Sequence, residues 1–216
     1  TLVEMTIVTA IFALLTVVVV YKYGDFTSNL LVTNMAYEIA LTVRQAQAFG
    51  VGVRGFDLDG ERTCGYPYGV FFNLNFNDGS VAVENQNRNF IFFIDRDDDK
   101  RCGDGDTNTV GDIHCSCETG DECIDRLSLQ RNIRITELRV GNTNCVANSA
   151  IQEIAVSFKR PSPEARIIRQ DSDYGIDDVY GFAQIKIEAP ASDINPSYVL
   201  IRKNGQISVS GNDICN

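Results

Sequence analysis

The chain has 216 residues and a formal net charge of −10, from 29 acidic and 19 basic residues. Beyond a long N-terminal helix it leaves roughly 165 residues, which is enough for one domain that buries its own core. An acidic chain repels polyphosphate, so we expect no nucleic-acid partner. The single histidine has no nucleophile pattern around it, and there is no glycine-rich phosphate loop. We therefore expect a protein with no enzymatic activity and no catalytic residues.

Residues 1–50 are predicted to form one long helix, and its first half is apolar on every side. Between Met5 and Tyr21 there is no charged residue, and a helix of that length nearly matches the ~30 Å hydrocarbon core of a bilayer. Glu4 lies at the edge of this run, where a carboxylate costs on the order of a few kcal/mol unless it finds a partner. The segment predicts a membrane anchor or the interior of a helix bundle, and Glu4 predicts a specific contact.

The second half of the helix, from about Thr27, is predicted to be amphipathic. Apolar side chains recur at spacings of three and four, which is typical of a helix face packed on a globular core. These side chains are Leu31, Met35, Ile39, Val43, Ala46 and Phe49. Gly50 and Gly52 are expected to end the helix. Four successive valines and Gly24 are poor helix formers, so we expect the helix to be weakest, and open to local unwinding, over Val17–Gly24.

After Gly52 the apolar residues follow a period of two, which predicts a β-rich head. Strands are expected at 70–76, 90–95, 133–140, 151–158 and 182–188, and two further strands are expected within 198–210. Asn204-Gly205 lies between these last two and predicts a two-residue hairpin turn. The predicted fold class is α+β, with a long N-terminal helix packed against an antiparallel, β-rich head. The predicted parts are an apolar anchor or filament-core helix at 1–26, an amphipathic helix at 27–52 and the head at 53–216.

The acidic residues gather in the segment 95–125, directly after a predicted strand. Asp95, Asp97, Asp99 and Asp106 stand at the first, third, fifth and twelfth positions of an EF-hand-like loop, and Asp104 and Asp112 offer further oxygens. Dense carboxylate oxygens suit Ca²⁺ better than a transition metal. Against this, Lys100 replaces the expected turn glycine, and Lys100 and Arg101 bring their own positive charge. The alternatives are a calcium site and a solvated acidic loop.

Seven cysteines are present: Cys64, Cys102, Cys115, Cys117, Cys123, Cys145 and Cys215. The apolar N-terminus suggests export, so disulfides are favoured, and the odd number leaves one thiol unpaired or bonded to another chain. The stretch His114–Cys123 offers a soft-metal cluster as the alternative, although C-x-C-x5-C is not a usual zinc spacing.

The opening residues "TLVEMTIVTAI" resemble the F-T-L-x-E processing motif of type IV pilins and of the pseudopilins of type II secretion. The stretch "MAYEIALTVRQAQAFGVGVRGF" extends this likeness to about residue 56 and is most similar to the H-type minor pseudopilins. The leading phenylalanine of the motif is absent before Thr1, and so is the family's helix-breaking proline. We expect the chain either to begin after processing or to keep its apolar run as an anchor.

The resemblance implies an assembly mechanism and a set of partners. A prepilin peptidase processes such chains and methylates their N-terminus, and the pilus assembly machinery then draws them from the inner membrane into a helical homopolymer. In the filament the N-terminal helices form a bundle, in which Glu4 would face the N-terminal amine of a neighbouring subunit. Thr1 is the first residue here and is therefore the second residue expected to take part in assembly. The resemblance also raises the expectation of calcium in the head. It implies a Cys145–Cys215 disulfide that ties the last residues to the sheet.

Three functions follow from these observations. The first is a structural subunit of an extracellular type IV pilus, with roles in adhesion, twitching motility and surface attachment. The second is a minor pilin or pseudopilin of a secretion or DNA-uptake system. The third, from another class, is a membrane-anchored, Ca²⁺-dependent binding module that does not polymerise. The amphipathic second half of the helix argues against the third, because a simple anchor needs no such stripe.

Overall fold

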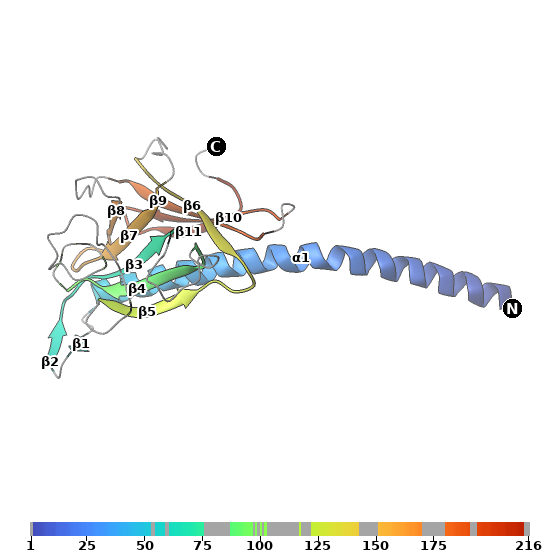
Figure 1. Ribbon diagram of the computed structural model, residues 1–216, viewed down its shortest axis with the longest axis horizontal. Coiled ribbons are helices and arrows are strands. Elements are labelled where there is room, and N and C mark those ends of the chain that lie inside the picture. Colours follow the sequence, from blue (N-terminus) through green and yellow to red (C-terminus); the bar gives the residue numbers. More distant parts are fainter. Residues whose placement is uncertain are drawn as a thin grey trace.

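The structure is a computed structural model, and it describes a defined subset of the chain. The described residues are 2–52, 55–58, 61–75, 87–96, 98, 100, 102, 117, 122–142, 151–169, 180–190 and 194–213. One helix and eleven strands lie in these residues. Figure 1 shows a long helix whose C-terminal half lies within a β-rich head and whose N-terminal half extends away from it.

The helix, α1, runs without interruption from Leu2 to Val51. This matches the predicted helix at 1–50, and the backbone N–H of Gly52 closes the last turn by donating to the carbonyl of Ala48 at 3.0 Å. The stretch Val17–Gly24 is helical in this single chain. The poor helix propensity of four valines therefore does not break the helix here.

Two antiparallel sheets form the body of the head, and a two-stranded hairpin stands apart from them. The five-stranded sheet has the order β5 (Cys123–Ser128), β4 (Asn89–Ile94), β3 (Tyr68–Asn73), β7 (Glu153–Phe158) and β8 (Ala165–Arg169). The four-stranded sheet has the order β11 (Ile207–Ser210), β10 (Ser197–Arg202), β9 (Phe182–Glu188) and β6 (Arg134–Gly141). The hairpin pairs β1 (Gly55–Leu58) with β2 (Glu61–Cys64). This combination of a helix with antiparallel sheets confirms the α+β class.

The main apolar core lies between α1 and the inner faces of both sheets. Val32, Ile39 and Val43 of α1 have no exposed surface and belong to the same buried cluster as side chains of both sheets, such as Phe72 and Ile185. Phe49, near the end of the helix, contacts the rings of Tyr68 and Phe92, with ring centroids 5.6 and 5.9 Å apart. Burial of this kind is worth roughly 1.5–3 kcal/mol for each large apolar side chain.

The hairpin that ends the four-stranded sheet differs from its prediction. Ile201 pairs with Ile207, and the N–H of Arg202 donates to the carbonyl of Gln206 at 2.8 Å. The connection therefore has three residues, Lys203, Asn204 and Gly205, and the predicted two-residue turn is wrong. Gly205 adopts φ +84°, the left-handed conformation that ends a three-residue hairpin loop.

Four strands were not predicted: β1, β2, β5 and β8. Of these, β5 overlaps the end of the segment assigned to the acidic loop, because it begins at Cys123. The predicted strand at 70–76 begins earlier, at Tyr68, and ends at Asn73. Phe76 lies outside the described residues.

Candidate assembly surface and acidic loop

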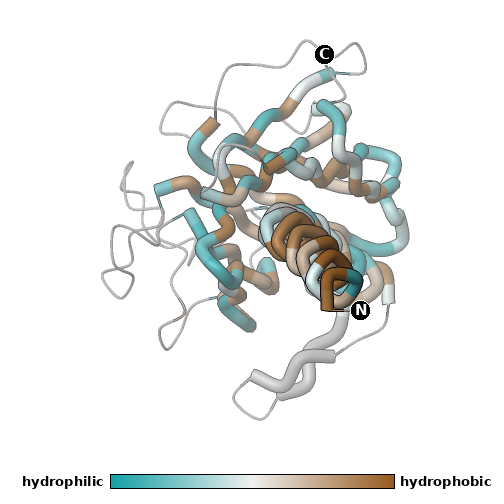
Figure 2. Tube along the Cα trace, turned by 90° about the vertical axis from the view of Figure 1, so that its right-hand side faces the viewer, coloured by the Kyte–Doolittle hydropathy of each residue, from teal (hydrophilic) through white to brown (hydrophobic). Residues whose placement is uncertain are grey.

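The first twenty residues of α1 form the largest apolar surface in the described part of the chain. The stretch Leu2–Tyr21 has a mean hydropathy of 2.5, and none of its most apolar window is buried. In Figure 2, which looks along the helix from its N-terminus, this half is mostly brown, with a few paler and teal turns. By length and composition it is long enough to cross a membrane, a test that signal sequences also pass. Soluble proteins rarely expose a continuous apolar surface of this extent, so the segment needs an apolar surrounding.

The hydroxyl groups within this segment do not interrupt its apolar character. Thr6 Oγ1 donates to the carbonyl of Val3 at 2.8 Å, Thr9 Oγ1 donates to that of Met5 at 3.0 Å, and Thr16 Oγ1 donates to that of Phe12 at 2.8 Å. Each hydroxyl is therefore satisfied by the helix that carries it. The segment can enter lipid or a helix bundle without leaving a threonine donor unpaired.

Glu4 lies in the first turn of α1 and is exposed. It is the only charged residue before Lys22. A carboxylate in the first turn interacts favourably with the positive end of the helix dipole, typically by 0.3–1 kcal/mol. That is less than the cost of taking a carboxylate into an apolar medium, so Glu4 still requires a stronger partner once the segment is buried. Thr1, the predicted second assembly residue, lies outside the described residues.

The second half of α1 is fixed to the head by polar contacts as well as by the core. Gln47 Nε2 donates to the carbonyls of Pro163 and Gly205, each at 3.0 Å. Arg44 donates through Nη2 to the carbonyl of Ile207 at 3.1 Å. These bonds connect α1 to the loop before β8 and to the β10–β11 hairpin.

Of the predicted calcium ligands, the structure describes Asp95 alone. Asp97, Asp99, Asp104, Asp106 and Asp112 lie outside the described residues. Asp95 follows β4 and is fully buried, and its backbone N–H donates to the carbonyl of Pro67 at 3.0 Å. Its Oδ2 accepts the backbone N–H of Lys100 at 3.1 Å and lies 3.8 Å from Arg166 Nη1 of β8.

The backbone conformation and the donor atoms of the acidic loop bear on the calcium prediction. Lys100 has φ +73°, so it adopts the left-handed conformation that glycine takes at the sixth position of an EF-hand loop. The donors are hard oxygens, as Ca²⁺ requires. The described residues contain no group of three or more His, Cys, Asp or Glu side chains that could hold a metal. Asp95 and the backbone at Lys100 fit a calcium loop, and calcium stays a prediction.

Asp98 has a role that the sequence did not predict. Its Oδ1 accepts a hydrogen bond from Arg166 Nη1 at 2.8 Å, and its Oδ2 pairs with Lys159 Nζ. Burial alone would raise the pKa of Asp98, but hydrogen bonds and charge from Lys159 and Arg166 outweigh it and lower the pKa below the usual value. The loop is thus connected to the β7–β8 hairpin by cations from more than sixty residues away.

Glu122 is a second acidic residue that the sequence did not single out. It is buried just before β5, where its Oε1 accepts the backbone N–H of Arg96 at 2.5 Å and its carbonyl accepts that of Ile94 at 2.9 Å. Glu122 therefore connects the start of the acidic loop, at Arg96, to the end of β4. Asp98 stands at the fourth position of the loop and Glu122 lies well beyond the twelfth, so neither matches a ligand position and the spacing gave no signal.

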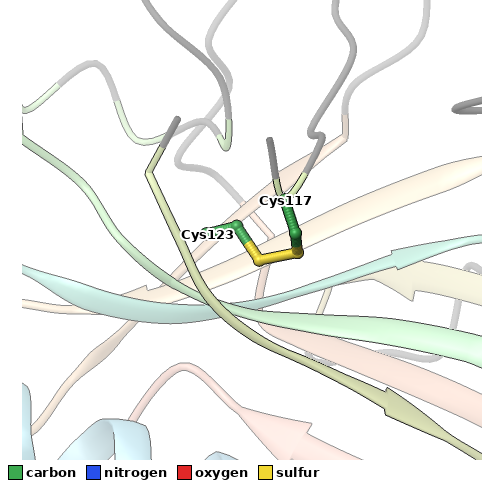
Figure 3. Close-up of a disulfide and its surroundings, with 2 residues drawn as sticks. All are labelled: Cys117 and Cys123. Atoms are coloured by element: carbon green, nitrogen blue, oxygen red, sulfur yellow. A yellow bond between two sulfur atoms is a disulfide. The ribbon is translucent and has the colours of Figure 1, made fainter. Parts of the chain in front are cut away.

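One disulfide joins the end of the acidic segment to the sheet. Cys117 and Cys123 are bonded, with Cα atoms 5.0 Å apart (Figure 3). Cys102 is also disulfide-bonded, and it packs with Phe71, Ile91, Phe93 and Ala155 in a small cluster separate from the main core. Cys123 adjoins the same cluster.

These bonds bear on the soft-metal alternative for His114–Cys123. Because Cys117 and Cys123 are bonded to each other, neither offers the thiolate that zinc requires, and that alternative is wrong for this pair. Cys115, Cys145 and Cys215 lie outside the described residues. Cys64 ends β2, and its pairing stays untested, as does the predicted Cys145–Cys215 disulfide.

Comparisons with protein-family profiles, with curated proteins and with solved structures found no match to this chain.

Proposed function

We propose that this chain is a structural subunit of a type IV pilus filament, assembled through bundled N-terminal helices. One observation supports this most: a single continuous helix packs on the head along its second half, whereas its first stretch, Leu2–Tyr21, is exposed and has Glu4 as its one charged residue. The processing-like motif around Glu4 adds to it. Before assembly the apolar half would lie in the inner membrane, and after assembly it would lie in the core of an extracellular filament.

Under this proposal Glu4 selects the position at which a new subunit docks. A carboxylate and an amine that are both removed from water are each costly alone, and pairing offsets that cost. Sliding one helix along another separates the two groups, so the pair also fixes the axial register. The neighbouring subunit's N-terminal amine supplies the positive charge. Processing by a prepilin peptidase would be required to create it.

A mixed-assembly experiment tests this role. A tagged Glu4→Ala chain is expressed beside the untagged wild type, and sheared filaments are separated from membranes. Loss of one partner from a buried pair costs roughly 3–5 kcal/mol, so incorporation should fall by a hundredfold or more while the protein stays in the membrane. Lys22→Ala, which removes the charge at the other end of the apolar run, is the matched control and should be incorporated. Normal pili made from Glu4→Ala chains alone would contradict the proposal.

Two further candidates share the same helix. A minor pilin or pseudopilin of a secretion or DNA-uptake system would carry the same assembly surface, and it would be scarce in sheared filaments, whereas a major pilin would dominate them on a gel. A membrane-anchored, Ca²⁺-dependent binding module would be absent from filaments altogether. For all three candidate functions, Asp95 would contribute one ligand to the predicted calcium ion.

A further inference from the structure

The five-stranded sheet buries apolar side chains on both of its faces. Along β3, Val70 and Phe72 belong to the main core, whereas Phe71 between them points to the other face, because successive side chains of a strand alternate. We call the small buried cluster on this other face the outer cluster. Its members are Phe71, Ile91, Phe93, Cys102 and Ala155, each at most 1% exposed. Because α1 and the four-stranded sheet lie on the inner face, the outer cluster needs a different cover.

The strand register makes the outer cluster continuous across three strands. Phe71 lies opposite Ile91 of β4 on one side and opposite Ala155 of β7 on the other. In the adjacent row Phe93 lies opposite Gly69, and a Cβ at Gly69 would lie 2.5 Å from two atoms of the Phe93 ring. The ring therefore rests directly on the glycine backbone. Without a cover, these side chains would form one apolar surface on the sheet.

The acidic loop is attached at both edges of this sheet and between them. At one edge, Asp98 accepts a hydrogen bond from Arg166 of β8 at 2.8 Å. Between the edges, Cys102 is fully buried among the apolar side chains of the outer cluster. At the other edge, Cys117 is bonded to Cys123 at the start of β5 (Figure 3). These three attachments place described residues of the loop across the outer face.

Two of the three attachments involve disulfide bonds. Cys102 is disulfide-bonded, and the bond between Cys117 and Cys123 is a separate one. Closing a long loop costs chain entropy, and a disulfide reduces that cost by restricting the open state. Among the described buried side chains of the main core there is no cysteine. The links that hold the loop on the outer cluster can therefore be broken without breaking a bond within the main core.

We propose that the acidic loop is a redox-controlled cover, held closed by these disulfides and by the ion pairs of Asp98. Reduction by a dithiol uncovers the outer cluster while α1 and the main core stay folded. A thiolate of the dithiol attacks one sulfur of the Cys117–Cys123 bond, and the second thiol of the reductant resolves the mixed disulfide. Two electrons and two protons pass to the cysteines, and the dithiol becomes a disulfide. The bond of Cys102 is reduced in the same way.

This device gives oxidation a defined place in the completion of the head. A reduced chain has a folded main core and an exposed apolar face, and oxidation closes that face. The inference does not depend on the proposed filament function, because it concerns the single chain.

Hydroxyl-radical footprinting of the purified full chain in detergent tests the cover. The protein is labelled oxidised and after reduction with a dithiol, in chelator, so that no bound cation holds the loop. Mass spectrometry confirms complete reduction and locates the labels. Labelling of Phe71 and Phe93 should rise severalfold on reduction. Phe72 and Phe90 lie on the inner face of the same two strands, are equally buried, and should stay protected as matched controls.

Three results would overturn the proposal. If all four phenylalanines stay protected after complete reduction, the cover does not depend on disulfides. If all four become labelled together, the head unfolds as a whole and has no separate cover. If the disulfides react with the dithiol only once the main core has unfolded, reduction cannot open the loop selectively.

The rate of reduction of the folded protein is a second measurement. Asp98→Asn weakens the attachment to β8 and should speed reduction roughly twofold to fivefold, the range expected for loss of an exposed ion pair. Glu188→Gln is the matched control, because it removes the pair with Lys186 on the four-stranded sheet, and it should leave the rate unchanged. Equal rates for Asp98→Asn and the wild type would overturn the proposal that ion pairs help to hold the cover.

Discussion

The contact between the end of α1 and β7 gives a specific test of the packing, because it requires a residue without a Cβ atom at position 50. Gly50 is buried in the last turn of the helix. A Cβ built there would lie 2.2 Å from the carbonyl oxygen and 2.9 Å from the carbonyl carbon of Phe158. Both of these are backbone atoms in or beside the five-stranded sheet. They cannot rotate away as the end of a flexible side chain can.

Two effects of Gly50→Ala oppose each other. Alanine has a helix propensity up to about 1 kcal/mol better than glycine, so in an exposed helix the change would stabilise the protein. Here the helix end must separate from β7 by nearly an ångström to relieve the contact, and forcing extra volume into a packed core typically costs 1–3 kcal/mol or more. The steric effect is larger, so we expect Gly50→Ala to lower the unfolding free energy by roughly 1–3 kcal/mol. For a domain of this size that corresponds to a fall in unfolding temperature of roughly 2–12 °C.

The assay is thermal unfolding of the purified protein in detergent, followed by near-ultraviolet circular dichroism. Gly211→Ala is the matched control, because a Cβ at Gly211 meets nothing within 4 Å, and its stability should change by no more than about 0.5 kcal/mol. If Gly50→Ala is as stable as the wild type, or more stable, the close approach of α1 to β7 is not a feature of the folded protein.

Two further predictions concern the acidic loop and the helix. Replacing a chelator with Ca²⁺ should raise the unfolding temperature and protect the loop from proteolysis, since a ligand that binds only the folded state stabilises it. Asp97→Asn should reduce that rise in unfolding temperature. Asp98→Asn should lower the unfolding temperature even in chelator, because Asp98 pairs with Lys159 and Arg166. If chelator changes neither the unfolding temperature nor the proteolysis of the loop, the calcium prediction is wrong. In the filament, Val17–Gly24 should be less helical than its flanks, because its propensity penalty is of order 2–3 kcal/mol. An unbroken ladder of i to i−4 hydrogen bonds from Met5 to Phe49 in a filament structure would refute this.

The elements that were predicted correctly carry strong periodicity. The helix has apolar side chains at intervals of three and four over its second half, and β9 alternates so regularly that its predicted bounds, 182–188, match the structure. The strands that were missed lack this signal. β5 is an edge strand with the polar sequence CIDRLS, and β8 is the opposite edge of the same sheet. No residue of β5 is buried, so its sequence shows no apolar alternation. In β8 the buried residues Ala165, Ile167 and Ile168 are few and do not alternate strictly, so the period of two is too short to recognise.

The hairpin turn was misjudged for a tertiary reason. Asn-Gly between two strands favours a two-residue loop when local sequence alone decides. Here the turn also packs against the helix and the loop before β8. A Cβ at Gly205 would lie 2.3 Å from the carbonyl oxygen of Pro163 and 2.6 Å from Gln47 Nε2. The glycine is needed for this close approach as well as for its φ, and nothing in the local sequence shows that.

The acidic loop shows the same limit. Its position after β4 and its density of carboxylates were evident from the sequence. Its connection to Lys159 and Arg166 was not, because those residues follow β7 and lie within β8, and only the sheet order brings them beside the loop. Spacing identifies ligands within one loop, but it cannot identify counter-charges that arrive from another hairpin.

The two halves of α1 also explain how one segment can serve in two surroundings. Every backbone group in the middle of a helix is satisfied within that helix, so the apolar half can leave lipid and enter a bundle without breaking a backbone hydrogen bond. Its threonine hydroxyls are satisfied in the same way. Under the proposed function, the transfer therefore exchanges apolar neighbours for apolar neighbours, at little net cost. Glu4 is the exception within the segment, because its carboxylate can remain among headgroups at the membrane surface but needs a positive partner inside a bundle. Under the proposed function, the free energy that discriminates a correctly docked subunit from a misaligned one is then concentrated at this residue.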